Sequence, residues 1–99
     1  MSPEIADRLA TLRIQLQAEA KGHCLFSRDL CMALVERTDS GFGSIGSTGI
    51  LTETGLAYLM WRGDRALLAG KVGETAAEPA QVDAIRKFSE DLKAALGNP

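Results

Sequence analysis

The sequence predicts an α+β fold, in which amphipathic helices at the N- and C-terminal ends pack on a small antiparallel β-meander of about three strands. Two observations predict this fold class. Apolar residues recur with helical spacing at both ends of the chain, and a β-hairpin signal stands in the middle. A length of 99 residues supports one hydrophobic core, so we expect a single globular domain over residues 1–99.

The N-terminal segment carries a helix start followed by one apolar stripe. Ser2 offers a capping hydroxyl, and Pro3 suits the first helical turn because no backbone amide is needed there. The stripe, with spacings of four, three and four, is Ile5, Leu9, Leu12 and Leu16. We therefore expect a helix over residues 4–21, ended by Gly22.

The C-terminal segment has the same organisation. Pro79 begins the pattern and Gly97 follows it, as is typical of the two ends of a helix. The apolar positions between them are Val82, Ile85, Phe88, Leu92 and Leu96. This spacing predicts a helix from about residue 79 to residue 96.

The middle of the chain contains two turn signals. Apolar residues 56–61 and 66–69 flank the letters RGDR, in which Gly63-Asp64 suits a two-residue hairpin loop. The cross-strand pairs expected from this loop are Arg62–Arg65, Trp61–Ala66, Met60–Leu67, Leu59–Leu68 and Ala57–Gly70. A second tight turn at Thr54-Gly55 would place Thr48 opposite Trp61, Ile50 opposite Leu59 and Leu51 opposite Tyr58. Together the two turns predict a three-stranded meander.

The apolar run from Leu30 to Val35 fits either a buried strand or a buried helix. Its Leu, Met, Ala, Glu and Arg content favours a helix over about residues 27–38, with Ser27 as its cap. The alternative is that this apolar run forms a fourth strand of the meander.

The segment SGFGSIGSTGIL, residues 40–51, has glycines spaced as in two phosphate-binding motifs. Neither match is complete, because no helix is predicted after it and Ser47 stands where the P-loop lysine belongs. One interpretation is a strand whose glycines leave room for large neighbours. The other is a glycine-rich loop, Gly41 to Thr48, that binds an anion. The residues of that anion site would be Gly43, Ser44, Gly46, Ser47 and Thr48.

The chain offers few residues for metal binding or nucleophilic catalysis. His23, Cys24 and Cys31 are its only soft ligands, fewer than a tetrahedral zinc site needs, so no metal is predicted. Adjacency of His23 and Cys24 does not make a catalytic pair, because neighbouring side chains point apart. We therefore predict packed thiols, no cofactor and no catalytic residue.

Charge and hydropathy exclude two classes of partner. A net charge of -2 gives no overall positive field for DNA or RNA, so no nucleic acid is expected. The longest apolar runs have six residues, too few to span a membrane, and the N-terminal residues do not resemble a signal peptide. With two cysteines and no secretory feature, a cytoplasmic protein is predicted.

The predicted hairpin is apolar on both faces, which is unusual for a monomer of this size. One face holds Tyr58, Met60, Leu67 and Ala69, and the other holds Ala57, Leu59, Trp61, Ala66 and Leu68. A symmetric homodimer would bury the uncovered face, with Leu59, Trp61, Leu68 and Tyr58 as its contacts. The predicted function is a small cytosolic binding or regulatory module that acts through protein contact, and the lack of a complete catalytic constellation in the sequence favours a protein that is not an enzyme. The alternative is a small-ligand, nucleotide or phosphate-binding protein, or an enzyme, that uses the glycine-rich loop from Gly41 to Thr48.

Overall fold

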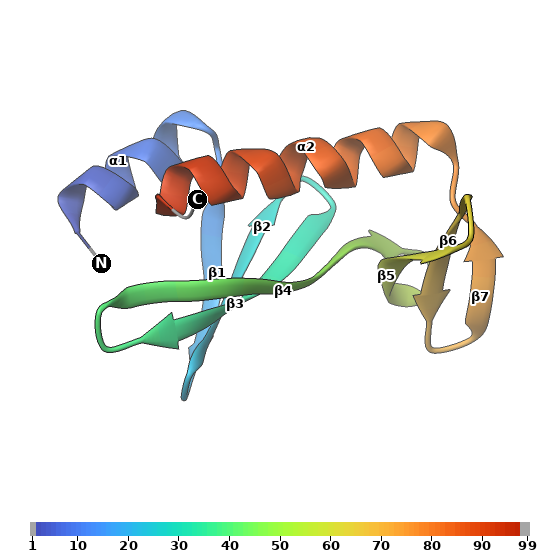
Figure 1. Ribbon diagram of the computed structural model, residues 1–99, viewed down its shortest axis with the longest axis horizontal. Coiled ribbons are helices and arrows are strands. Elements are labelled where there is room, and N and C mark those ends of the chain that lie inside the picture. The colour runs from blue at the N-terminus through green and yellow to red at the C-terminus, as the bar shows by residue number, and fades with distance from the viewer. Residues whose placement is uncertain (1, 98–99) are drawn as a thin grey trace.

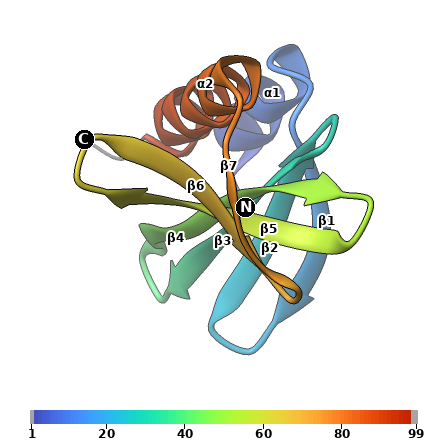
Figure 2. The ribbon, with the colours of Figure 1, turned by 90° about the vertical axis from the view of Figure 1, so that its right-hand side faces the viewer.

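Seven antiparallel strands form one meander sheet, and both helices lie on the same side of it (Figures 1 and 2). The structure is a computed structural model and describes residues 2–97. In chain order the elements are α1 (Pro3–Thr11), β1 (Gln15–Ala20), β2 (His23–Arg28), β3 (Cys31–Thr38), β4 (Gly41–Thr52), β5 (Gly55–Arg62), β6 (Arg65–Gly70), β7 (Gly73–Ala76) and α2 (Pro79–Leu96). Each strand pairs with its neighbours in sequence. The prediction of about three strands is therefore wrong, because the fold is mostly sheet.

The N-terminal helix is shorter than predicted. Ser2 caps it as expected, since its hydroxyl accepts a hydrogen bond from the amide of Ile5 at 3.3 Å. The helix ends at Thr11, and Arg13 adopts a positive φ of 61° that turns the chain into β1. Residues 14–20, IQLQAEA, alternate apolar and polar side chains, and this period of two is that of a strand. Leu16 thus lies in β1 and does not continue the helical stripe.

The predicted helix over residues 27–38 is also wrong, and the alternative of a strand is correct. Residues 23–28 and 31–38 form β2 and β3, joined by a tight turn in which Asp29 has a φ of 54°. Alternate residues of the apolar run, namely Cys31, Ala33 and Val35, are buried toward the helices. A strand buries these three side chains and supplies the backbone hydrogen bonds of its neighbours, and this outweighs a modest helix propensity.

The β5–β6 hairpin has the predicted register, with Arg62 opposite Arg65 and Leu59 opposite Leu68. The preceding turn is displaced by two residues along the partner strand, so that Ile50 lies opposite Ala57 and not opposite Leu59. The hydroxyl of Thr52 explains the position of this turn. It accepts from the amide of Thr54 at 3.3 Å and donates to the carbonyl of Gly55 at 2.7 Å. An even displacement keeps every side chain on its predicted face.

The core lies between α2 and the sheet. Helix α2 spans residues 79–96 as predicted, and its C-terminal residue is followed by Gly97 at a φ of 74°. Ile85, Phe88 and Leu92 are buried against Phe26, Ala33, Val35 and other side chains of the sheet. Helix α1 packs beside the C-terminal part of α2, where Nε of Arg8 donates to the carbonyl of Ala95 at 2.8 Å. The helices therefore cover one face of the sheet and leave the other to solvent (Figure 2).

Candidate functional site

A groove of about 480 Å³ lies between α2 and the strands β4 and β5. We call it the helix-side groove. Its lining residues are Gly46, Ser47 and Thr48 of β4, Leu59 and Trp61 of β5, and Val82, Ile85, Arg86 and Ser89 of α2. The fold thus brings part of the predicted anion loop and two of the predicted interface residues into one place.

Three of the polar side chains that line the helix-side groove, Thr48, Arg86 and Ser89, already have partners. The hydroxyl of Ser89 donates to that of Thr48 at 3.3 Å, and Nη2 of Arg86 lies 3.0 Å from Oδ1 of Asp83. Trp61 is 57% exposed although it is the largest apolar side chain near the groove. The groove is therefore mainly an aromatic and aliphatic surface with hydroxyls at its edge.

The glycine-rich segment lies in a strand and not in a loop. Residues 41–52 are β4, which pairs with β3 on one side and with β5 on the other. A Cβ at Gly49 would overlap the carbonyl oxygen of Ala57, so the close approach of β5 requires glycine there. The strand interpretation of this glycine is therefore correct, although the group that requires glycine is the backbone of Ala57 and not a large side chain. Gly43 and Ser44 do not line the helix-side groove, and anion binding by this segment stays a prediction.

The second candidate surface is the face of the sheet that points away from the helices. We call it the outer face and define it by Leu25, Met32, Leu34, Leu51, Tyr58 and Met60. Leu25 lies opposite Leu34 on adjacent strands, and Gly49 stands between Met32 and Tyr58 in one cross-strand row. Leu34, Leu51 and Tyr58 are each more than 40% exposed. Within residues 2–97, no helix covers this face (Figure 2).

The four predicted interface residues do not share one surface. Tyr58 belongs to the outer face, whereas Leu59 and Trp61 line the helix-side groove. Leu68 is only 3% exposed and belongs to the core. Sequence reasoning missed Leu25, Met32, Leu34 and Leu51 as candidates; Met32 and Leu34 were missed because residues 27–38 were expected to be helical. Assigning residues 30–35 to a strand with two apolar faces would have found Met32 and Leu34.

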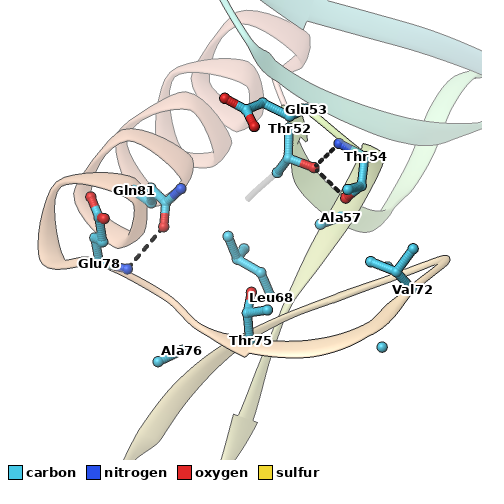
Figure 3. A pocket seen from close by; sticks show the side chains of 12 residues that line it. Thr52, Glu53, Thr54, Ala57, Leu68, Val72, Thr75, Ala76, Glu78 and Gln81 are labelled. Carbon is cyan, nitrogen blue, oxygen red and sulfur yellow. Dashed lines mark hydrogen bonds between the residues drawn. The ribbon is translucent and has the colours of Figure 1, made fainter.

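A smaller hollow of about 340 Å³ lies between the β4–β5 turn, the β6–β7 hairpin and the start of α2 (Figure 3). Leu68 points into it, and the turn threonines Thr52 and Thr54 stand at its edge (Figure 3). The amide of Glu78 donates to Oε1 of Gln81 at 2.9 Å, which caps α2. The polar groups of this hollow thus stabilise a turn and a helix end.

Both cysteine side chains are buried thiols, as predicted. Cys24 is 1% exposed and Cys31 is 5% exposed, and neither forms a disulfide. Burial raises the pKa of the Cys31 thiol, while the nearby Arg28 opposes the rise. In the part of the chain that the structure describes, no three side chains of His, Cys, Asp or Glu converge as metal ligands would.

No protein-family model matches this chain, and neither does a curated protein or a solved structure. Neither helix, over the residues described, is long and apolar enough to cross a lipid bilayer. The functional argument therefore depends on the surfaces of the molecule itself.

Proposed function

We propose that this protein is a binding module that acts through protein contact, and that its outer face joins a second copy of the chain in a symmetric homodimer. The observation that carries the proposal is the exposure of Leu34, Leu51 and Tyr58 on neighbouring strands, on the side of the sheet that the helices leave open. Contiguous exposed apolar side chains on a small protein usually mark a contact surface.

A closed two-fold dimer is the favoured partner arrangement, because an apolar face is chemically complementary to itself. The charged side chains that the register places on the outer face between β2 and β5, Glu36 and Arg62, stand toward strand ends, so stacking two apolar centres desolvates little charge. A face-to-face contact of this kind buries the aliphatic side chains that water otherwise surrounds.

The decisive measurement is the solution mass by size-exclusion chromatography with light scattering, over a hundredfold dilution. The proposal expects about 21 kDa, twice the 10.6 kDa chain, at the higher concentrations. Leu34→Glu and Tyr58→Lys would shift the protein to a monomer, because each places a charge in the desolvated contact.

Two further variants locate the contact. Val72→Glu changes a side chain that is 71% exposed in the β6–β7 turn, so it leaves the dimer intact and serves as the matched control. Trp61→Glu changes the helix-side groove and should also leave the dimer intact. A monomer of wild-type protein at every concentration would overturn the homodimer, and dissociation by Trp61→Glu alone would move the contact to the groove.

A further inference from the structure

A separate groove of about 690 Å³ lies beside the middle of α2, away from the β6–β7 hairpin. Its walls are the C-terminal end of α1, the β2–β3 turn and the middle of α2. We call it the arginine groove because Arg28 lines it. Its volume falls within the range of about 300–1,000 Å³ that is usual for small-molecule sites.

Arg28 is held in place through one nitrogen of its guanidinium group. Nη1 donates to the carbonyl of Leu12 at 3.2 Å and to Oδ2 of Asp91 at 2.8 Å. The guanidinium carbon also lies 5.6 Å from the ring centre of Phe88. Nε and Nη2 of this side chain make no hydrogen bond to the residues that the structure describes. Among those residues, no fully buried side-chain nitrogen lacks a hydrogen-bond partner, so these two nitrogens are not fully buried. The two bonds of Nη1 also fix the orientation of the guanidinium plane.

The charges around the arginine groove favour an anion. Arg13 and Lys87 line it without an ion pair to any described residue. Of the two acids that line it, Asp91 is already paired with Arg28, which leaves Asp29. Three cations thus face two carboxylates, and a negative group entering the groove would meet an excess of positive charge.

The remaining walls of the arginine groove are apolar. Leu12, Leu30, Ile50 and Ala84 contribute them. Leu30 stands in the β2–β3 turn with 54% of its surface exposed, although a polar residue is usual in such a turn. An apolar ligand segment lying on these side chains would remove them from water.

We propose that the arginine groove binds a small aliphatic carboxylate. The carboxylate accepts hydrogen bonds from Nε and Nη2 of Arg28, with Arg13 and Lys87 on either side. The aliphatic tail lies against Leu12, Leu30 and Ile50. A planar guanidinium is suited to a carboxylate, because two parallel N–H groups match its two oxygens.

Octanoate, 1-octanol and acetate are the probes, titrated into ¹⁵N-labelled wild-type protein at neutral pH and followed by amide chemical shifts. The proposal expects saturable shifts confined to residues 11–13, 28–31, 50 and 84–91. Octanoate should bind at least about tenfold more tightly than octanol, which lacks the charge, or acetate, which lacks the tail.

The double variant Arg13→Gln, Lys87→Gln tests the positive charge, because both side chains are exposed and their loss leaves the core intact. It should weaken octanoate binding by about tenfold and leave octanol unchanged. Lys93→Gln, on the same helix and outside the groove, is the matched control and should change neither. Leu30→Ser should weaken both octanoate and octanol.

Several results would overturn this assignment. One is equal affinity for octanoate and octanol, and another is shifts centred on the outer face or the helix-side groove. A double variant with wild-type octanoate affinity would also reject it, as would the lack of saturation by about 10 mM octanoate. The solution mass of the protein has no bearing on these outcomes, so they are independent of the proposed homodimer.

Discussion

Arg28 in β2 and Asp91 in α2 form an ion pair, with Nη1 2.8 Å from Oδ2, that ties the C-terminal helix to the sheet. The two side chains are 63 residues apart in sequence and only 17% and 27% exposed. The same Nη1 holds the carbonyl of Leu12 at the end of α1. One guanidinium thus connects both helices to the strand that passes beneath them.

Asp91→Asn is expected to lower the free energy of unfolding by about 1.5–3 kcal/mol, because Arg28 then loses a charged partner in a largely desolvated place. Urea unfolding followed by circular dichroism measures this loss. Asp83→Asn is the matched control on the same helix, since its pair with Arg86 is exposed, and it should change stability by less than about 0.5 kcal/mol. Equal effects of the two variants would show that the Arg28–Asp91 pair contributes no more than a surface pair.

Gly49→Ala is expected to destabilise the protein by about 1–3 kcal/mol, because the added methyl group meets the backbone of Ala57 and forces β4 and β5 apart. Ser47→Ala, an exposed position on the same strand, should change stability by less than about 0.5 kcal/mol. Thermal and urea unfolding of the two variants give the comparison. A Gly49→Ala protein as stable as wild type would contradict the close approach of these strands.

Ionisation of the buried Cys31 thiol is expected to lower the stability of the folded protein in alkaline solution. Burial raises the pKa of its thiol in the folded state, so the unfolded chain releases the proton at lower pH. The stability from the neutral thiol is fully present below the ordinary thiol pKa and is lost as pH rises from that value through the raised pKa of the folded state. Urea unfolding at pH 7 and at about pH 9.5, with reductant, should show wild type losing stability relative to Cys31→Ala. A difference that stays constant with pH would contradict this linkage.

Trp61 gives an optical test of which surface a second copy covers. It is the only tryptophan of the chain and is 57% exposed in the helix-side groove. Because the proposed dimer uses the outer face, iodide should quench its fluorescence equally at high and low protein concentration. Protection of Trp61 at high concentration would instead indicate a contact through the groove.

Local signals accounted for the parts of the fold that were predicted correctly. The Ser2 cap, the Gly63-Asp64 hairpin and the 79–96 helix each depend on residues within a few positions of one another. Their geometry is set by backbone sterics and by hydrogen bonds between near neighbours, so the chain carries the information locally.

The candidate surfaces were predicted only in part, because solvent exposure depends on which elements cover which face. Tyr58, Leu59, Trp61 and Leu68 were grouped from the alternation of one hairpin. Alternation already places Tyr58 on the face opposite the other three, and the position of α2 then separates Leu59 and Trp61, which line the groove, from Leu68 in the core. Nothing in the spacing of these four residues specifies where a helix 18 residues long will lie.

The limit of prediction from sequence alone is clearest for residues 13–38. The amino-acid sequence alone establishes that the run from Leu30 to Val35 within this segment is apolar enough to be partly buried, and it establishes the turn and helix signals at either end of the chain. Whether the segment is helix or strand depends on partners far away, since β2 and β3 gain their hydrogen bonds from adjacent strands and their cover from α2. Long-range pairing and burial outweigh a weak local propensity, and only the folded chain supplies them.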